Sequence, residues 1–539
     1  MDELLQRPVQ ATAITLLLVA VTFLYRTLHY KRFTQNAHLP QFPSSLLWGH
    51  IKLFYDYTKR GKMDRHPDYM FTEMYQTLGE PPVMLVDNWP IVPPLVVIPS
   101  HHVAEQISKS SSTFPYSTPK AWSVEHLRPL LGYKSIFLWQ NKEWKAIRRR
   151  LSPGFAPQHL MTLLPIIVEK LTPYVENLDE FVRKREAFPL DEVTTNLTFD
   201  VIAAVSISED MYAQQPGRQH DLLQFPWWMA PLPHLRRYRL GERISQRLRE
   251  IVRRDFADMK AKERNHEDAG RLRTVVALSL QHVESLTPDV LEETCDQIKT
   301  FFFAGQDTTS AVLIWTIYEL SRTPHVLTCV QDELDMLFGK NGAHDPAIVC
   351  AKLLEPGGDE LIHRMRYISA VLKEVMRLHP PAGSMRWAPP GAGFVVSTPD
   401  AGAYNLDGCW LYLEHNLIQR DRAVYGDSAD DFVPERWLSS NADGFPVGSW
   451  RAFERGPRNC MGQELANIEL RVIVAILAQR YEFTKVGLGE PQLDQQGRPM
   501  IDDKGQFKVK SELYNTFRIA SKPVDGMMMK VKLASPTSG

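Results

Sequence analysis

The ten residues from Phe453 to Gly462 constrain this chain more than any other segment, because they place a cysteine beside an arginine and between glycines. Glycines let the backbone turn tightly without Cβ clashes. A helical pattern begins at Gln463, so Cys460 precedes a helix N-terminus, where free amides and the positive dipole stabilise a thiolate. Arg458 adds a cation, and the apolar ring of Phe453 favours the dry surroundings that tune a bound metal. The segment therefore predicts a thiolate able to act as a metal ligand.

The ordinary alternative is a buried, unreactive cysteine in a glycine-containing loop. At average residue frequencies, however, the spaced set of Phe, Gly, Arg, Cys and Gly arises by chance in well under about one chain per thousand of this length. The segment resembles the haem-binding loop of the cytochrome P450 family, F-x-x-G-x-R-x-C-x-G, at every fixed position. The resemblance implies haem b with Cys460 as the axial thiolate and iron ligand, Arg458 beside a haem propionate, and Phe453 as an apolar wall.

Two further family motifs lie upstream of this loop in the expected order. Glu374 and Arg377 form an E-x-x-R motif, and Arg436 follows in a P-E-R motif. Alone, E-x-x-R is uninformative, because it occurs four more times and an i,i+3 ion pair on a solvated helix face gives the same pattern. The resemblance implies a buried triad of these three side chains. Buried charges are tolerated only when each has partners, so we expect the three to act as one unit.

A long helix is expected over 287–322, because Thr287 and Pro288 suit the N-cap and first helical positions. Gly305 lies in its interior, where glycine costs about 1 kcal/mol relative to alanine. A reason is therefore required, and we expect Ala304 and Gly305 to remove bulk so that a flat cofactor and O2 can approach the backbone.

The next two residues of this helix, Asp307 and Thr308, match the acid–alcohol pair of the family. The resemblance implies catalytic roles: the Thr308 hydroxyl holds water, and Asp307 feeds protons from the solvent side. The alternative is a threonine that bonds back to a helix carbonyl and an aspartate that faces water.

Three more residues correspond to positions that contact the haem propionates in the family. Trp144 and Arg148 form W-x-x-x-R and share one face of a helix at i and i+4. Asn141 replaces a glycine common in relatives, but asparagine also tolerates a left-handed backbone. Arg386 corresponds to a further propionate-binding arginine, with a surface arginine as the alternative.

The run from Val9 to Tyr25 is apolar and uncharged, near the short end of what spans a bilayer. Basic residues follow it, which places the rest of the chain in the cytosol by the positive-inside rule. A buried core helix is the alternative. We expect residues 1–33 to be a membrane anchor with a short basic flank, and 34–539 to be the cytochrome P450 haem domain. By resemblance to microsomal relatives, the chain should be a single-pass protein of the endoplasmic reticulum membrane.

The rest of the sequence predicts a mainly α fold with small β-sheets, as in the cytochrome P450 fold. Helical periodicity covers 158–185, 235–264, 324–338, 361–378 and 461–480, while 82–99, 393–413 and the segment after 481 favour strands. The composition is that of a globular protein, with 44% hydrophobic and 23% charged residues. The net charge of −1 gives no support for a nucleic-acid partner, which requires a basic excess.

Family resemblance implies a monooxygenase that takes electrons from an NADPH-cytochrome P450 reductase. One oxygen atom of O2 enters a large apolar substrate, by hydroxylation or epoxidation, and the other leaves as water; a thiolate ligand favours that cleavage. Lys142, Lys145 and the run 148–150 predict a positive patch for an acidic reductase. A solvated helix face is the alternative for these charges.

Aromatic segments indicate the substrate class. Phe301, Phe302 and Phe303, the stretch 382–384, and the stretch 225–229 favour a large apolar, aromatic or polycyclic compound, and the style resembles fungal members that tailor polyketide-like secondary metabolites. Two other functions stay open. One is a haem-thiolate isomerase or dehydratase that needs neither O2 nor a reductase, and the other is a membrane-bound haem protein that only binds a ligand or carries electrons.

Overall fold

The computed structural model describes residues 2–215, 231–264, 274–340, 342–398, 402–438, 444–516, 518 and 520–534. The chain forms two compact units. The first comprises residues 1–121 and 383–418, and the second comprises 122–382 and 419–539.

The first unit is built on a four-stranded sheet in the order β1-β2-β7-β4, in which β2 and β7 are parallel and the other pairs antiparallel. A separate hairpin joins β5 to β6. The strands are β1 (Met84–Val86), β2 (Leu95–Ile98), β4 (Ser384–Trp387), β5 (Val395–Thr398), β6 (Gly402–Asn405) and β7 (Trp410–Leu413). The helices are α2 (Ile51–Lys59), α3 (Pro67–Thr77), α4 (His101–Ser108) and α17 (His415–Ile418). The strands predicted over 82–99 and 393–413 are thus confirmed, each range containing more than one strand.

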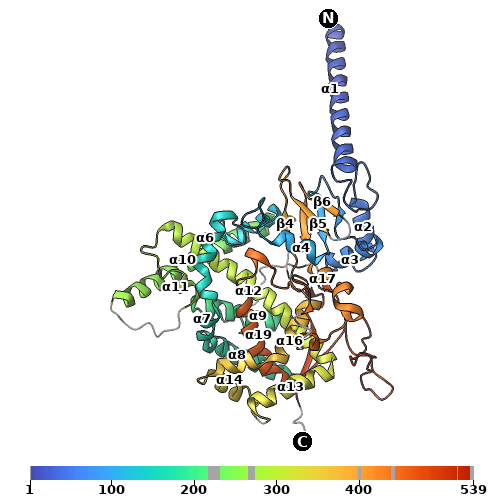
Figure 1. The fold of residues 1–539 in the computed structure, drawn as a ribbon. Coiled ribbons are helices and arrows are strands. Elements are labelled where there is room, and N and C mark those ends of the chain that lie inside the picture. The colour runs from blue at the N-terminus through green and yellow to red at the C-terminus, as the bar shows by residue number, and fades with distance from the viewer. Residues whose placement is uncertain are drawn as a thin grey trace. The chain divides into compact units, whose positions relative to one another are not determined.

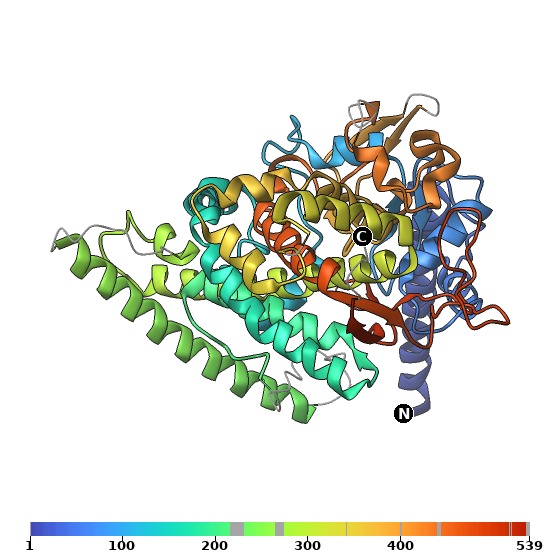
Figure 2. The same ribbon diagram turned by 90° about the horizontal axis from the view of Figure 1, so that it is seen from below.

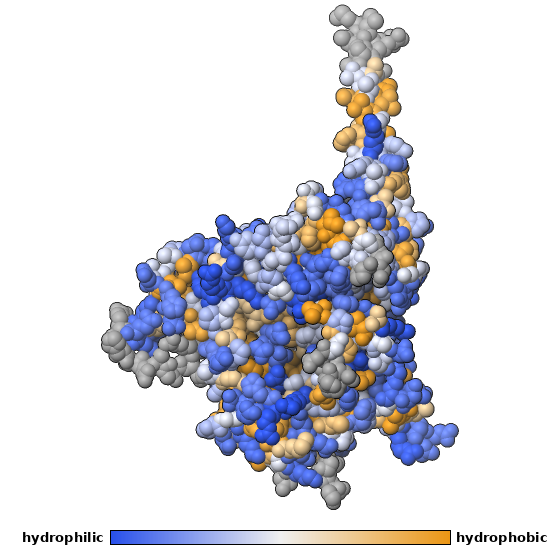
Figure 3. Space-filling view, viewed as in Figure 1, coloured by the Kyte–Doolittle hydropathy of each residue, from blue (hydrophilic) through white to orange (hydrophobic). Residues whose placement is uncertain are grey.

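At the N-terminal end of this unit, α1 (Asp2–Tyr30) continues into a short π-helix, η1 (Lys31–Gln35). The helical segment over residues 11–35, part of which is the helix labelled α1 in Figure 1, is long and apolar enough to cross a membrane. From Ile14 to Tyr25 its large apolar side chains are exposed (Figure 3). The far end of this segment is different, because Arg32 is only 2% exposed and pairs with Asp87. The helix therefore ends inside the folded unit.

The second unit is mainly helical. Its α-helices are α5 (Arg128–Leu131), α6 (Asn141–Leu151), α7 (Pro157–Thr162), α8 (Leu164–Lys184), α9 (Leu190–Ile207), α10 (Pro231–Arg264), α11 (Val275–Ser279), α12 (Pro288–Arg322), α13 (Pro324–Phe338), α14 (Pro346–Leu354), α15 (Gly358–Arg364), α16 (Arg366–Leu378), α18 (Arg422–Tyr425) and α19 (Gln463–Arg480). Short 3-10 turns are η2 (Trp122–Leu127), η3 (Ser152–Phe155), η5 (Gly426–Asp430), η6 (Pro434–Trp437) and η8 (Gly456–Arg458). Two small sheets complete it: β3 (Phe188–Pro189), β11 (Met528–Leu533) and β8 (Tyr481–Lys485) in that order, and β9 (Asn515–Thr516) with β10 (Lys522–Pro523).

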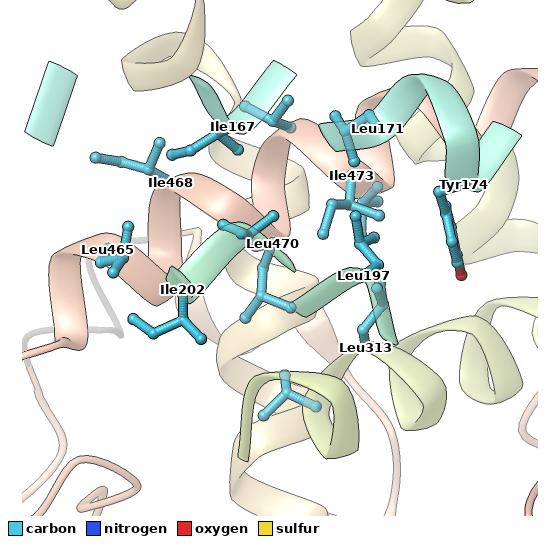
Figure 4. Close-up of a cluster of buried hydrophobic side chains, with 14 of the residues drawn as sticks. Ile167, Leu171, Tyr174, Leu197, Ile202, Leu313, Leu465, Ile468, Leu470 and Ile473 are labelled. Carbon is cyan, nitrogen blue, oxygen red and sulfur yellow. The ribbon is translucent and has the colours of Figure 1, made fainter. Parts of the chain in front are cut away.

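The helix α12 is the central element of the second unit, with α9, α13, α16 and α19 packed against it (Figures 1 and 2). Its first turn is capped as expected, because the Thr287 side chain accepts a hydrogen bond from the amide of Val290. The core beside it combines leucines and isoleucines of α8, α9, α12 and α19, such as Leu171, Leu197 and Ile473 (Figure 4). Each such fully buried side chain stabilises the fold by about 1.5–3 kcal/mol.

Most of the expected helices are confirmed, and two are divided. The range 361–378 contains the end of α15 and all of α16, with a break at Met365. The range 158–185 contains α7 and α8, which separate at Leu163 before Pro165. A proline is accepted in the first turn of a helix, where no amide donor is needed, so it starts α8 rather than continuing α7.

Candidate active site

The cysteine loop presents its sulfur at the start of a core helix. The amide of Cys460 donates to the Phe453 carbonyl at 2.8 Å, which closes the loop, and Gly456 has a φ of +73° that suits glycine. Gly462 is the N-cap of α19, so Cys460 lies two residues before the N-cap. Phe453 packs against the core, whereas Cys460 is exposed. A side chain with this placement can reach a ligand or a cofactor.

Three of the predicted haem-binding residues meet beside this cysteine. In α6, Trp144 is buried and Arg148 lies one turn later. The Arg458 guanidinium lies 4.2 Å from the centre of the Trp144 ring. Arg148 donates to the carbonyl and the side-chain oxygen of Asn459, at 2.8 and 2.6 Å. The structure therefore joins the W-x-x-x-R helix to the cysteine loop.

The charges of this cluster suit a group that carries carboxylates and a metal. Burial lowers the pKa of Arg148, and a negative charge on Cys460 acts in the opposite direction. A guanidinium has five N–H donors, of which Arg148 uses two on Asn459. A soft thiolate for iron, paired cations for propionates and an aromatic wall fit haem.

The predicted triad is confirmed. Glu374 accepts from Arg377 at 2.8 and 2.9 Å and from Arg436 at 3.0 Å, and the Glu374 and Arg377 side chains are fully buried. The amide of Val433 and the indole of Trp437 also donate to this carboxylate, at 3.0 and 2.9 Å. Five donors on one buried carboxylate fix η6 against α16.

The acid–alcohol pair of α12 has contacts that only partly match the expectation. The Thr308 hydroxyl donates to the Ala304 carbonyl at 2.6 Å, which is the back-bonded arrangement given above as the alternative. Asp307, in contrast, does not simply face water, because its Oδ1 lies 2.7 Å from the ammonium of Lys522. The pair is therefore tied to the helix on one side and to a lysine on the other.

Gly305 has a close neighbour in another helix. A Cβ at this position would lie 2.8 Å from Cγ1 of Ile202 in α9, so the missing side chain permits the close packing of α12 on α9. Ala304, the other small residue expected to leave room for a cofactor, is exposed, and its neighbours Phe303 and Gly305 are half-buried. The role of Gly305 in cofactor binding stays a prediction.

The structure also bears on two predicted basic features. Arg386, in β4 of the first unit, is only 1% exposed, which excludes the surface-arginine alternative. In the run 148–150, Arg148 bonds to Asn459 and Arg150 pairs with Glu293 at 2.7 Å, so both are half-buried and have partners within the protein. The exposed members of the predicted patch are Lys142, Lys145 and Arg149.

The three consecutive phenylalanines of α12 have different partners. Phe301 is a core residue with its ring 5.3 Å from Phe155, and Phe302 packs on Phe199 of α9 at 5.5 Å. Phe303 makes an edge-to-face contact with Phe137 at 6.2 Å. Of the three, Phe303 is thus the one on neither the core nor the α9 side. The aromatic stretch 225–229 lies outside the described residues.

Some residues of the site carry no family motif. Asn459 occupies a variable position of the loop pattern, and Lys522 lies in a two-residue strand near the C-terminus. Both are recognisable only from their contacts. Trp437 directly follows the P-E-R motif, so its indole N–H could have been recognised from the sequence as a donor to the buried charges.

Comparison with known proteins shows which family the chain belongs to. The cytochrome P450 family model matches residues 59–509. Cytochrome P450 monooxygenase acrF of Aspergillus aculeatus is 29% identical over 78% of this chain and 88% of its own length. Cytochrome P450 monooxygenase polC of Polytolypa hystricis is 26% identical over 85% of this chain and 84% of its own. The haem domain of a cytochrome P450DA mutant has the same fold, with a TM-score of 0.67 at 18% identity over 92% of this chain and 98% of that chain.

The family match covers parts of both units and every motif named above. It implies haem b bound through a cysteine thiolate, for which the cluster around the cysteine loop offers fitting donors. The chain is a member of the cytochrome P450 family and a haem-thiolate monooxygenase.

Proposed function

We propose that this chain is a membrane-anchored monooxygenase of fungal secondary metabolism that uses Cys460 as the axial thiolate. The observation that carries the ligand assignment is the exposed Cys460 side chain at the N-terminal end of α19. Its neighbour Asn459 joins it to Arg148, so the loop and α6 hold the ligand together. When bound, the haem supplies oxygen activation, and the thiolate favours O–O bond cleavage.

The protein side chains then hold the cofactor and manage protons. Arg148, Arg458, Arg386 and Trp144 are assigned to the propionates, and Phe453 keeps the sulfur side dry. Thr308 holds water through its hydroxyl, which requires a χ1 rotation away from the Ala304 carbonyl; threonine has two accessible χ1 rotamers in a helix. Asp307 carries protons on its carboxylate.

The substrate is proposed to be large, apolar and polyketide-like, and to be hydroxylated or epoxidised. Phe303 with its edge-to-face partner Phe137, next to the exposed Ala304, supports an aromatic or polycyclic compound. The similarity to two fungal monooxygenases supports the placement in fungal metabolism.

The membrane and the reductase complete the proposal. The apolar helix over residues 11–35 supports a single-pass anchor in the endoplasmic reticulum membrane, with both units on the cytosolic side. An NADPH-cytochrome P450 reductase would supply the electrons, and Lys142, Lys145 and Arg149 offer its acidic surface an exposed basic strip.

The first test is the visible spectrum of the full chain, reduced and treated with carbon monoxide, for wild type and Cys460→Ala. We expect the red-shifted thiolate-type Soret band in wild type and its absence in the variant. Correctly folded wild type that shows only the imidazole-type band would contradict the ligand assignment.

Turnover separates the possible reactions. With the reductase in lipid nanodiscs, aromatic polyketides should stimulate NADPH oxidation, and oxygen from labelled O2 should enter the product. Conversion of an organic peroxide without NADPH or reductase would instead identify an isomerase or dehydratase. A spectrum with no turnover of either kind would leave a ligand-binding or electron-carrying haem protein.

A further inference from the structure

The ammonium of Lys522 connects two helices, α9 and α12, to the antiparallel strand pair of β9 and β10, which we call the C-terminal hairpin. Lys522 lies in β10 and is 2% exposed. Its Nζ lies 2.7 Å from Asp307 Oδ1 on α12, 2.6 Å from Asp191 Oδ1 on α9, and 2.8 Å from Thr195 Oγ1 on α9. Three elements that are far apart in the sequence therefore meet at one nitrogen.

The number of oxygens around this nitrogen equals the number of donors that it has. A lysine ammonium has three N–H donors and no acceptor. Asp307, Asp191 and Thr195 provide one oxygen each, so the ammonium cannot turn without losing a hydrogen bond. A buried ammonium that loses a partner is costly. This arrangement holds the Asp307 carboxylate at a fixed point.

The surroundings keep both ends of the junction in place. On the hairpin, the amide of Ser521, next to Lys522, donates to the Pro381 carbonyl at 2.8 Å. On α9, Asp191 also pairs with Arg518 at 3.2 Å. The two carboxylates, Asp191 and Asp307, are thus accompanied by two cations, Lys522 and Arg518. Thr198 donates to the carbonyl of Gln306, the residue before Asp307, at 2.8 Å. The backbone of this turn of α12 is thus fixed from α9, and the Asp307 side chain is held by Lys522 of β10.

We propose that Lys522 is a positioning residue for the acid of α12: its ammonium, carried by Asp191 and Thr195, fixes the Asp307 carboxylate in the orientation from which that acid supplies protons. The inference rests on the proposed role of Asp307 in proton delivery. It adds a residue of the C-terminal hairpin and a carboxylate of α9 to the reaction, although neither belongs to a family motif quoted above.

The test compares Lys522→Met with Lys485→Met in the full, haem-loaded chain. Lys485 is a matched control, because it pairs with Asp525 at 2.6 Å and its side chain is 2% exposed, against 3% for Lys522. Both variants remove a buried cation, but only the first changes a partner of α12. Both should retain the thiolate-type Soret band.

Lys522→Met should lower kcat by about tenfold, a modest part of the 10²–10⁴ that proton transfer commonly contributes. KM should stay within about twofold, since the lysine acts through Asp307 and not on the substrate. Less of the oxidised NADPH should yield product, and the solvent isotope effect on kcat should rise. Lys485→Met should show neither change, and Lys522→Arg should restore part of the loss. Equal kcat, coupling and isotope effect in the two methionine variants would overturn the inference.

A second readout does not depend on turnover. The losses in unfolding midpoint for Lys522→Met and Asp307→Asn should be less than additive in the double variant, because one interaction is removed by both changes. Additive losses would show that the two groups are not coupled, and would overturn the inference even if the enzyme is active. If wild type has no NADPH-dependent turnover, the proposed function fails, while this cycle still decides whether Lys522 holds Asp307.

Discussion

Arg148 and Asn459, which lie 311 positions apart in the chain, are joined by two hydrogen bonds of 2.8 and 2.6 Å. Asn459 immediately precedes the proposed iron ligand, so this contact makes the position of Cys460 depend on α6. A hydrogen bond from a charged donor typically contributes about 1.5–3 kcal/mol.

Replacement of Arg148 by alanine should therefore loosen the cysteine loop as well as remove a proposed propionate partner. We expect purified Arg148→Ala to contain less than about half the haem of wild type, measured as the ratio of Soret to protein absorbance. Arg149→Ala is the control, because that neighbour is exposed. Equal haem content in the two variants would show that the contact is not needed for cofactor retention.

Loss of the Glu374 carboxylate should be among the most damaging single changes in the second unit. Removal of one partner from a buried ion pair costs about 3–5 kcal/mol, and Glu374→Ala removes the carboxylate partner of two arginines. We expect little folded, haem-containing protein on size-exclusion chromatography. Glu250→Ala provides the contrast, because this glutamate belongs to another E-x-x-R sequence, pairs with Arg247 on the surface and should be tolerated.

Glu469 predicts an unusual pH dependence of stability. Burial raises the pKa of Glu469 to about 8, and its Oε1 has no hydrogen-bond partner among the described residues. The folded state thus binds a proton more tightly than the unfolded state, whose ordinary value is 4.5. The cost of the buried charge is absent below that value and grows as the pH rises toward about 8.

Glu469→Gln should therefore gain stability over wild type as the pH rises, by on the order of 3 kcal/mol at pH 7, since one pKa unit corresponds to about 1.4 kcal/mol. Thermal unfolding midpoints between pH 5 and 8 provide the measurement. Glu469→Met, which also has no titrating group, should show the same trend. Parallel curves for wild type and both variants would exclude this explanation.

A methyl group added at Gly305 should disturb the packing of α12 on α9. The new Cβ would lie 2.8 Å from Ile202 Cγ1, and overpacking of this kind costs about 1–3 kcal/mol. We expect Gly305→Ala to lower the unfolding midpoint and Ile202→Ala, added to it, to recover part of that loss beyond the sum of the single effects. A Gly305→Ala protein of unchanged stability and reduced haem affinity would instead support the predicted role of Gly305 in cofactor binding.

Features that depend on residues close together in the sequence were predicted correctly. Thr287 with Pro288 fixes the start of α12 through local capping, and the glycines of the cysteine loop act on their own turn. The triad was also predictable, although Glu374 and Arg436 are well separated, because a family pattern records their contact.

Contacts without such a pattern could not be anticipated. The partner of Gly305 is Ile202, an ordinary apolar residue of another helix, and helix packing selects such partners by shape alone. Lys522 lies in a two-residue strand without periodicity, and only the folded chain brings it to Asp307. The division at Met365 was missed because the apolar period continues across it.

The buried Arg32 bears on where the N-terminal helix can be removed. This arginine pairs with Asp87 and donates to the carbonyls of Trp89 and Leu47. The segment around Arg32 is therefore part of the folded first unit and is not a flexible linker after the apolar helix. A shortened chain that starts at residue 34 would strand the Asp87 carboxylate in the interior, at a cost of several kcal/mol. A chain cut ahead of Leu28, itself 7% exposed, keeps that pair intact and is the natural starting point for a detergent-free preparation.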